Sequence, residues 1–214
     1  MARPTKLNDL IVKAQKDTGW NFANSVLYDL CKKYPKHDDP QKIVAKVWLI
    51  GRSYAAAIER GRTSGGPSED FYVDSVGPKL KKSSIDKLIS KVNGKIPSEK
   101  SLQLLIDVHE ELTQIFHVIS GRRNRSLASK YLHFHVPKFF FIYDSRARVG
   151  IGALNDLFDE APKKYKGGDG EYRCFVEKCL KVQTQLKEEY KVELNPRQLD
   201  NLLLAVENTA KVVR

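Results

Sequence analysis

The sequence has few cysteines and no long hydrophobic run, and each shortage excludes a class of protein. Its three cysteines, Cys31, Cys174 and Cys179, have no CxxC spacing among them. A small, odd number of cysteines argues against a disulfide framework or a structural zinc site, and three are too few for an iron–sulfur cluster held by four cysteines. The longest apolar runs, such as residues 139–143, fall well short of the ~20 residues that span a bilayer. Because the N-terminus also lacks an apolar signal segment, we expect a cytoplasmic protein with no membrane partner.

The chain contains enough hydrophobic residues to form a sizeable core. They make up 41% of its 214 residues, while charged residues make up 29%. This length suits one domain. We therefore expect a single helical domain over residues 1–214, and if it divides into two lobes we expect them at about 1–100 and 101–214.

The positive charge is concentrated in two segments. Of the net +11, residues 76–100 contribute +5, from seven Lys and two acids, and residues 121–148 contribute +6, from seven Lys or Arg and one acid. The rest of the chain is balanced. Localised positive charge is typical of a protein that binds a polyanion, so we expect a nucleic acid, DNA in the first place, as the partner. A solubility surface, an acidic membrane or an acidic protein is the alternative explanation.

Apolar residues recur at three- and four-residue spacing along most of the chain, which predicts an all-α fold. The predicted helices cover residues 8–16, 21–33, 40–60, 83–91, 98–120 and 171–190, and a last one begins after the N-cap Asn195, with Gln198 completing a capping box. Residues 61–70 and 161–170 are predicted loops because of their Gly, Ser and Pro content. Gly51 falls on the apolar stripe of 40–60, so we expect another helix to approach closely there.

The segment 121–148 combines basic residues with interleaved aromatics, as a nucleic-acid-binding groove does. Its cations would neutralise phosphates, although most of its rings are expected to belong to the core. The candidate phosphate contacts are Arg122, Arg123, Arg125, Lys138, Arg146 and Arg148, together with Lys81 and Lys82 from the first basic segment.

The residues SLASKYLHFHVPKFFFIYDSRAR, at 126–148, resemble the catalytic half of helix-hairpin-helix DNA glycosylases. In that family a lysine begins a helix after a small-residue hairpin, and a catalytic aspartate follows after a proline-bearing turn. The resemblance implies a helix-hairpin-helix glycosylase-like fold, with Lys130 as the lysine and Asp144 as the aspartate. The helix WLIGRSYAAAIER, at 48–60, is also similar to one in uncharacterised bacterial proteins.

The chemistry that this resemblance implies needs no cofactor. An amine attacks the sugar C1′ and forms a Schiff base, for which Lys130 would need a lowered pKa, from desolvation or from the neighbouring Arg122, Arg123 and Arg125. Asp144 would stabilise the positive charge that develops on the sugar and assist proton transfer. As structural alternatives, Asp144 is an N-cap or forms a salt bridge with an arginine, and Lys130 is a phosphate contact or a solvated residue at a helix start.

Two further groups of side chains are candidates for a ligand site. His133 and His135 are two residues apart and do not share a helix face, so we expect no metal there. Arg52 and Glu59, with Tyr54 between them, form either a buried ion pair or the lining of a pocket. His133 and Tyr143 are the other residues expected to line that pocket.

The sequence therefore predicts a DNA glycosylase or lyase-like enzyme that acts on a modified or damaged base, with Lys130 as nucleophile and Asp144 as charge-stabilising acid. The alternative is a non-catalytic DNA- or RNA-binding module, with phage defence as one setting. A third hypothesis is a partner of an acidic protein.

Overall fold

The structure is a computed structural model that describes residues 3–16, 18–60, 71–157 and 169–212. Every regular element in these ranges is helical, which confirms the all-α prediction, while the helix-hairpin-helix arrangement stays a prediction. The elements are α1 (Arg3–Gln15), α2 (Asn21–Lys33), α3 (Pro40–Ser53), η1 (Phe71–Val76), α4 (Gly77–Lys81), α5 (Ile85–Val92), η2 (Glu99–Ser101), α6 (Leu102–Ser120), α7 (Arg125–His135), α8 (Ser145–Leu157), α9 (Gly170–Tyr190) and α10 (Pro196–Val212). Among the described helices, none combines the length and apolar character needed to cross a bilayer.

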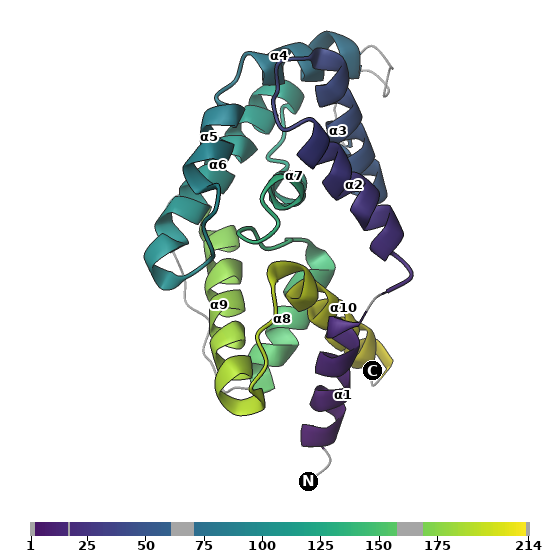
Figure 1. Cartoon of the computed structure of the whole chain (residues 1–214), viewed down its shortest axis with the longest axis vertical. Helices are drawn as coiled ribbons and strands as arrows, with labels where there is room; N and C mark the ends of the chain where they lie inside the picture. The colour runs from purple at the N-terminus through teal and green to yellow at the C-terminus, as the bar shows by residue number, and fades with distance from the viewer. Residues whose placement is uncertain (1–2, 17, 61–70, 158–168, 213–214) are drawn as a thin grey trace.

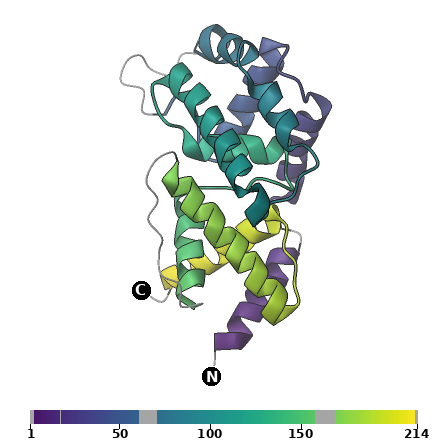
Figure 2. The same ribbon diagram turned by 90° about the vertical axis from the view of Figure 1, so that its left-hand side faces the viewer.

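The helices pack in two groups (Figures 1 and 2). One group holds α2 to α7, and the other holds α1 with α8, α9 and α10. The chain passes from one group to the other between α1 and α2 and again at residues 136–144, and α6 touches α9 across the boundary. The division expected near residue 100 does not follow this packing, because α6 packs on both α5 and α7.

Local capping signals place several helix ends where the sequence predicts them. At the start of α10, the Asn195 N–H donates to Gln198 Oε1 at 3.0 Å, and the Gln198 N–H donates to Asn195 Oδ1 at 2.9 Å. This reciprocal pair is the predicted capping box. Gly121 ends α6 in the left-handed conformation with φ of 75°, as a glycine at this position favours.

Helix α3 ends at Ser53, seven residues before the predicted end at residue 60. The chain turns at Ala55, which adopts a φ of 51°, and folds back on the helix. A Cβ on Gly51 would lie 3.1 Å from the Ala57 Cα, so the close approach predicted at Gly51 is real. The approaching segment is this turn, however, and not another helix.

Candidate functional site

Lys130 and Asp144 meet in the structure, although they come from different elements. The Lys130 Nζ lies 3.1 Å from Asp144 Oδ2. It also donates to the Ser126 hydroxyl at 2.7 Å and to the Tyr143 carbonyl at 3.1 Å. The Lys130 side chain is only 1% exposed, so it is neither a solvated residue nor a surface phosphate contact. The family resemblance implied that Lys130 begins a helix. In the structure it lies in the second turn of α7 instead.

Asp144 has two structural tasks at the start of α8. Its Oδ1 accepts from the Ala147 backbone N–H at 2.9 Å, so it caps the helix, while its Oδ2 faces Lys130. The N-cap, one of the alternatives from the sequence, is therefore present, whereas the salt bridge is formed with Lys130 and not with an arginine. The Asp144 side chain is 29% exposed and forms the solvent-facing side of the pair.

The two groups have shifted pKa values with different causes. Burial lowers the pKa of Lys130, and the carboxylate of Asp144 opposes this shift. Partial burial would raise the pKa of Asp144, but the Lys130 ammonium and the Ala147 N–H outweigh it and hold that pKa below its ordinary value. The cation that further lowers the Lys130 pKa is Arg197, from α10, which the sequence did not indicate.

Arg197, in the first turn of α10, and Asp200, three residues further on, are functional candidates that the sequence did not indicate. Arg197 Nη1 lies 3.1 Å from Asp200 Oδ2. Burial raises the pKa of Asp200 to about 6; Arg197 opposes this shift and Asp144 adds to it. Both residues resemble ordinary polar residues of a helix start in the sequence, and only the tertiary fold brings them to the Lys130–Asp144 pair.

A chain of hydrogen bonds runs from Arg197 to α7. The Arg197 Nε–H donates to the Tyr28 hydroxyl at 3.0 Å, and this hydroxyl lies 2.6 Å from His133 Nε2. His133 Nδ1 lies 2.8 Å from the Phe140 carbonyl, which can only accept, so Nε2 is the acceptor of the Tyr28 proton. Tyr54 packs against the same guanidinium, with its ring centroid 5.6 Å away. His133 and Tyr54 thus share Arg197 as a neighbour.

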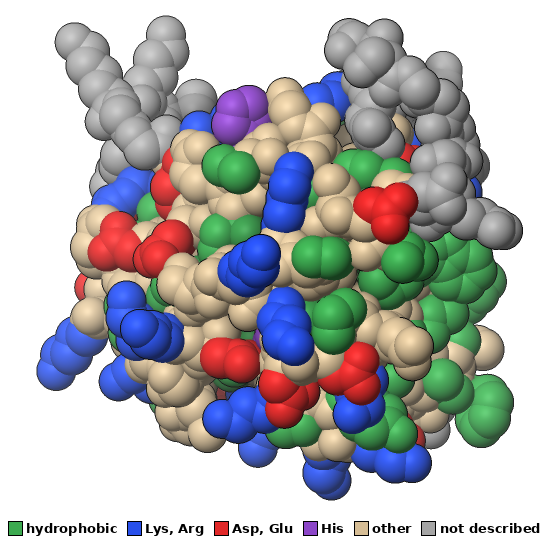
Figure 3. All heavy atoms as spheres, turned by 90° about the horizontal axis from the view of Figure 1, so that it is seen from above, with side chains coloured by type: hydrophobic (Ala, Val, Ile, Leu, Met, Phe, Trp, Pro, Cys, Tyr) green, Lys and Arg blue, Asp and Glu red, His purple; other side chains and the backbone are tan. Residues whose placement is uncertain are grey.

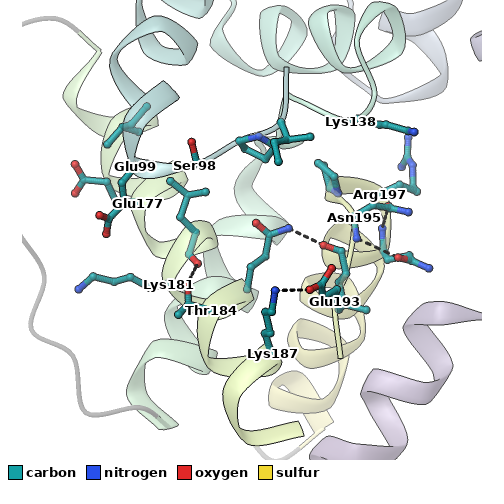
Figure 4. Close-up of a pocket in the computed structure, with 18 of the residues that line it drawn as sticks. Ser98, Glu99, Lys138, Glu177, Lys181, Thr184, Lys187, Glu193, Asn195 and Arg197 are labelled. Carbon is teal, nitrogen blue, oxygen red and sulfur yellow. Dashed lines mark hydrogen bonds and ion pairs between the residues drawn. The ribbon is translucent and has the colours of Figure 1, made fainter. Parts of the chain in front are cut away.

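A cleft of about 1300 Å³ opens beside this chain. It is lined by residues of η2, α6, α9, the start of α10 and the segment between α7 and α8, and its walls include Leu180 and Leu194. Figure 4 shows Lys138 and Arg197 at one end of the cleft. Lys130 and Asp144 do not line the cleft. Arg197 does line it, and its positive charge lowers the pKa of Lys130.

The other residues expected to line a pocket lie in separate clusters. Arg52 and Glu59 form an ion pair to which Tyr72 donates a hydrogen bond, so they tie the end of α3 to η1. The Tyr143 hydroxyl donates to Glu171 at the start of α9. Arg52, Tyr54, Glu59, His133 and Tyr143 therefore do not line one common pocket.

Most of the arginines predicted to contact phosphates have acidic partners within the chain. The ion pairs are Arg123–Glu110 at 2.6 Å, Arg125–Asp169 at 2.7 Å, Arg146–Glu207 at 3.0 Å and Arg148–Glu171 at 2.9 Å. Arg122 is exposed. The sequence could not reveal these pairs, because the acidic partners lie 13 to 61 residues away along the chain.

The lysines of the first basic segment are arranged differently. Lys81, Lys82 and the five other lysines of residues 76–100 are all exposed, and so is Lys138. Seen from above, the molecule presents basic, acidic and apolar side chains intermixed (Figure 3). This face therefore carries no continuous basic patch over its described residues.

Three buried histidines should make the fold sensitive to acid. Burial lowers the pKa of His37 and His109 to about 4 and that of His133 to about 3, against about 6.5 in an unfolded chain. Because the folded state binds these protons more weakly, their contribution to stability is complete above about pH 6.5 and is lost as the pH falls toward about 4. At about 1.4 kcal/mol per pKa unit, His37 alone contributes roughly 3 kcal/mol.

We expect the free energy of unfolding, measured with urea, to fall by several kcal/mol between pH 7 and pH 5. The raised pKa of Asp200, about 6, makes the free energy of unfolding increase as the pH falls, but the three histidines outweigh this single group. His37→Gln should flatten part of the dependence. A free energy of unfolding that is constant over this range would contradict the burial of neutral histidines.

Comparisons of the chain with protein-family models, with curated proteins and with solved structures gave no significant match.

Proposed function

We propose that this chain acts on DNA as a base-excision enzyme with lyase chemistry, in which Lys130 is the nucleophile and Asp144 the supporting acid. The observation that carries the proposal is the 3.1 Å contact between a fully buried amine and a carboxylate. Desolvation is one way in which a protein makes a lysine amine nucleophilic, and a carboxylate in contact with it can accept its proton.

Each member of the pair has a defined part in this chemistry. The neutral Lys130 amine attacks the sugar C1′ and the C1′–N bond to the base breaks, so the base leaves with the bonding electrons and takes a proton from water. The C1′–O4′ bond then breaks, the ring oxygen receives the amine proton by way of Asp144, and the C1′=N Schiff base forms. Lowering of the Lys130 pKa by burial increases the neutral fraction of the amine. Asp144, whose pKa is lowered, stays ionised, stabilises the positive charge on the sugar and accepts the amine proton.

The sugar has to approach from the side of Asp144. That side chain is 29% exposed, whereas Lys130 is covered, so the target nucleotide must leave the duplex and displace the solvent over Asp144. The seven lysines of residues 76–100 are all exposed, so their ammonium groups are available to the phosphate backbone.

Borohydride trapping tests this proposal. Wild-type protein, incubated with duplexes that carry an abasic site or one of a panel of modified bases, should give a covalent complex, because borohydride reduces a Schiff base to a stable amine. Lys130→Ala should abolish trapping while DNA binding persists. Lys32→Ala removes an exposed lysine of α2 and should trap like the wild type. Absence of a trapped species over the whole panel would overturn the proposal.

A second function, a non-catalytic nucleic-acid-binding module, is favoured by one observation. The Lys130 ammonium already has three internal partners: Ser126, the Tyr143 carbonyl and Asp144. Such a fully satisfied lysine suits a structural role. This alternative predicts binding that weakens steeply with salt and no trapped complex with any substrate.

A further inference from the structure

Three hydrogen-bond donors converge on the carboxylate of Glu171, in the first turn of α9. Arg125 Nη1 donates to its Oε2 at 2.8 Å, and Arg148 Nη1 lies 2.9 Å from its Oε1. The Tyr143 hydroxyl also donates to Oε1. These donors come from α7, from α8 and from the segment between them. Two guanidinium groups and a hydroxyl around one pair of oxygens is the set that recognises a phosphate.

One of the three donors, Arg125, is held in place independently of Glu171. Arg125 Nε donates to both oxygens of Asp169, at 2.7 Å each, and the Asp169 side chain is fully buried at the N-cap of α9. The Arg125 guanidinium also lies over the Tyr143 ring, 5.8 Å from its centroid. Burial, and then Glu171, raise the pKa of Tyr143, so its hydroxyl remains a donor. Removal of Glu171 would therefore leave Arg125 in place, with the Arg148 guanidinium and the Tyr143 hydroxyl released for another anion.

Glu171 is the exchangeable member of this cluster. Its side chain is 42% exposed and that of Arg148 is 55% exposed, whereas Asp169 is inaccessible. The Glu207 carboxylate that pairs with Arg146 is only 1% exposed, so it cannot be displaced in the same way. An exposed ion pair contributes little stability, so exchange of one anion for another costs little.

We propose that Arg125, Arg148 and the Tyr143 hydroxyl form a phosphodiester-binding site, which Glu171 occupies as an internal anion in the free protein. The inference rests on the proposed function, since the ligand is a DNA strand. The site adjoins the candidate nucleophile, because the Tyr143 carbonyl accepts from Lys130 and Asp144 is the next residue. A phosphate bound here would hold the strand beside the Lys130–Asp144 pair.

Binding of a fluorescein-labelled duplex, measured by anisotropy over a series of salt concentrations, tests the inference. Glu171→Gln should bind roughly tenfold more tightly than the wild type, because one charge-assisted competitor is gone. The dependence of log Kd on log salt should steepen by about one unit, as for one more phosphate contact. Arg148→Gln, added to Glu171→Gln, should remove most of the gain.

Glu189→Gln is the matched control, because it removes the same charge from an exposed residue near the other end of α9. The two glutamates are about 27 Å apart at 1.5 Å per residue, several Debye lengths at about 0.1 M salt. Glu189→Gln should change the affinity less than twofold. If the wild type binds DNA and Glu171→Gln gains no more than Glu189→Gln, this inference fails while the proposed function stands. If no variant binds DNA, both are overturned.

Discussion

Replacing Gly150 with alanine is expected to destabilise the protein by about 3 kcal/mol or more. Gly150 lies in α8, where this helix packs against α10. A Cβ there would be 2.2 Å from the Leu203 carbonyl oxygen, 2.7 Å from the carbonyl carbon and 2.9 Å from the Cα. All three are backbone atoms, so no side chain can rotate away and the two helices must separate. Overpacking of this kind typically costs 1–3 kcal/mol of stability. Because the backbone atoms around Gly150 cannot move aside, we expect a cost of about 3 kcal/mol or more.

Gly152 provides the control for this substitution. It lies two residues further along α8, and nothing is within 4 Å of the Cβ that alanine would add. Gly152→Ala should therefore leave the stability unchanged or raise it by up to about 1 kcal/mol, because alanine favours the helix. Urea unfolding of the two variants measures the difference. Equal stabilities would contradict the close contact between α8 and α10.

Asp144→Ala is expected to cost roughly 3–5 kcal/mol, because it leaves the buried Lys130 ammonium without its counter-ion. Loss of the cap on α8 adds about 1 kcal/mol. Asp144→Asn retains an oxygen for the Ala147 N–H, so it isolates the charge effect. The measurement is the free energy of unfolding in urea at pH 7.

The double variant Lys130→Met with Asp144→Asn shows whether charge or packing dominates. Removing both charges should recover most of the stability lost in Asp144→Asn, since an apolar side chain of similar volume can replace a buried ion. A double variant as unstable as Asp144→Asn would contradict the explanation that the unpaired Lys130 charge causes the loss. These stability measurements do not depend on whether the chain has a catalytic activity.

Local signals in the sequence predicted local structure well. The capping box of α10, the end of α6 at Gly121 and the bounds of α2 each depend on residues a few positions apart. The early end of α3 was missed because the small residues after Ser53 fit a helix as readily as a turn. The positive φ of Ala55 is imposed by packing of the turn against Gly51, which no propensity encodes.

The candidate site was predicted only in part, for a physical reason. The family resemblance singled out Lys130 and Asp144, but the sequence left open whether the two side chains meet, because the turn between α7 and α8 decides it. Arg197 and Asp200 reach the site from α10, and Asp169 and Glu171 from the start of α9. Such distant acids neutralise the arginines that the sequence displays as a basic patch. Net charge therefore indicated a polyanion partner, but it did not identify the cations that are available to bind one.

The central claim is that Lys130 is the nucleophile, and mapping the trapped adduct tests it most directly. Wild-type protein would be trapped with borohydride on an abasic duplex, digested with nuclease and protease, and analysed by mass spectrometry. We predict one modified peptide, with the reduced sugar remnant on the Lys130 Nζ. An adduct confined to exposed lysines such as Lys81 or Lys82, or no adduct at all, would contradict the account.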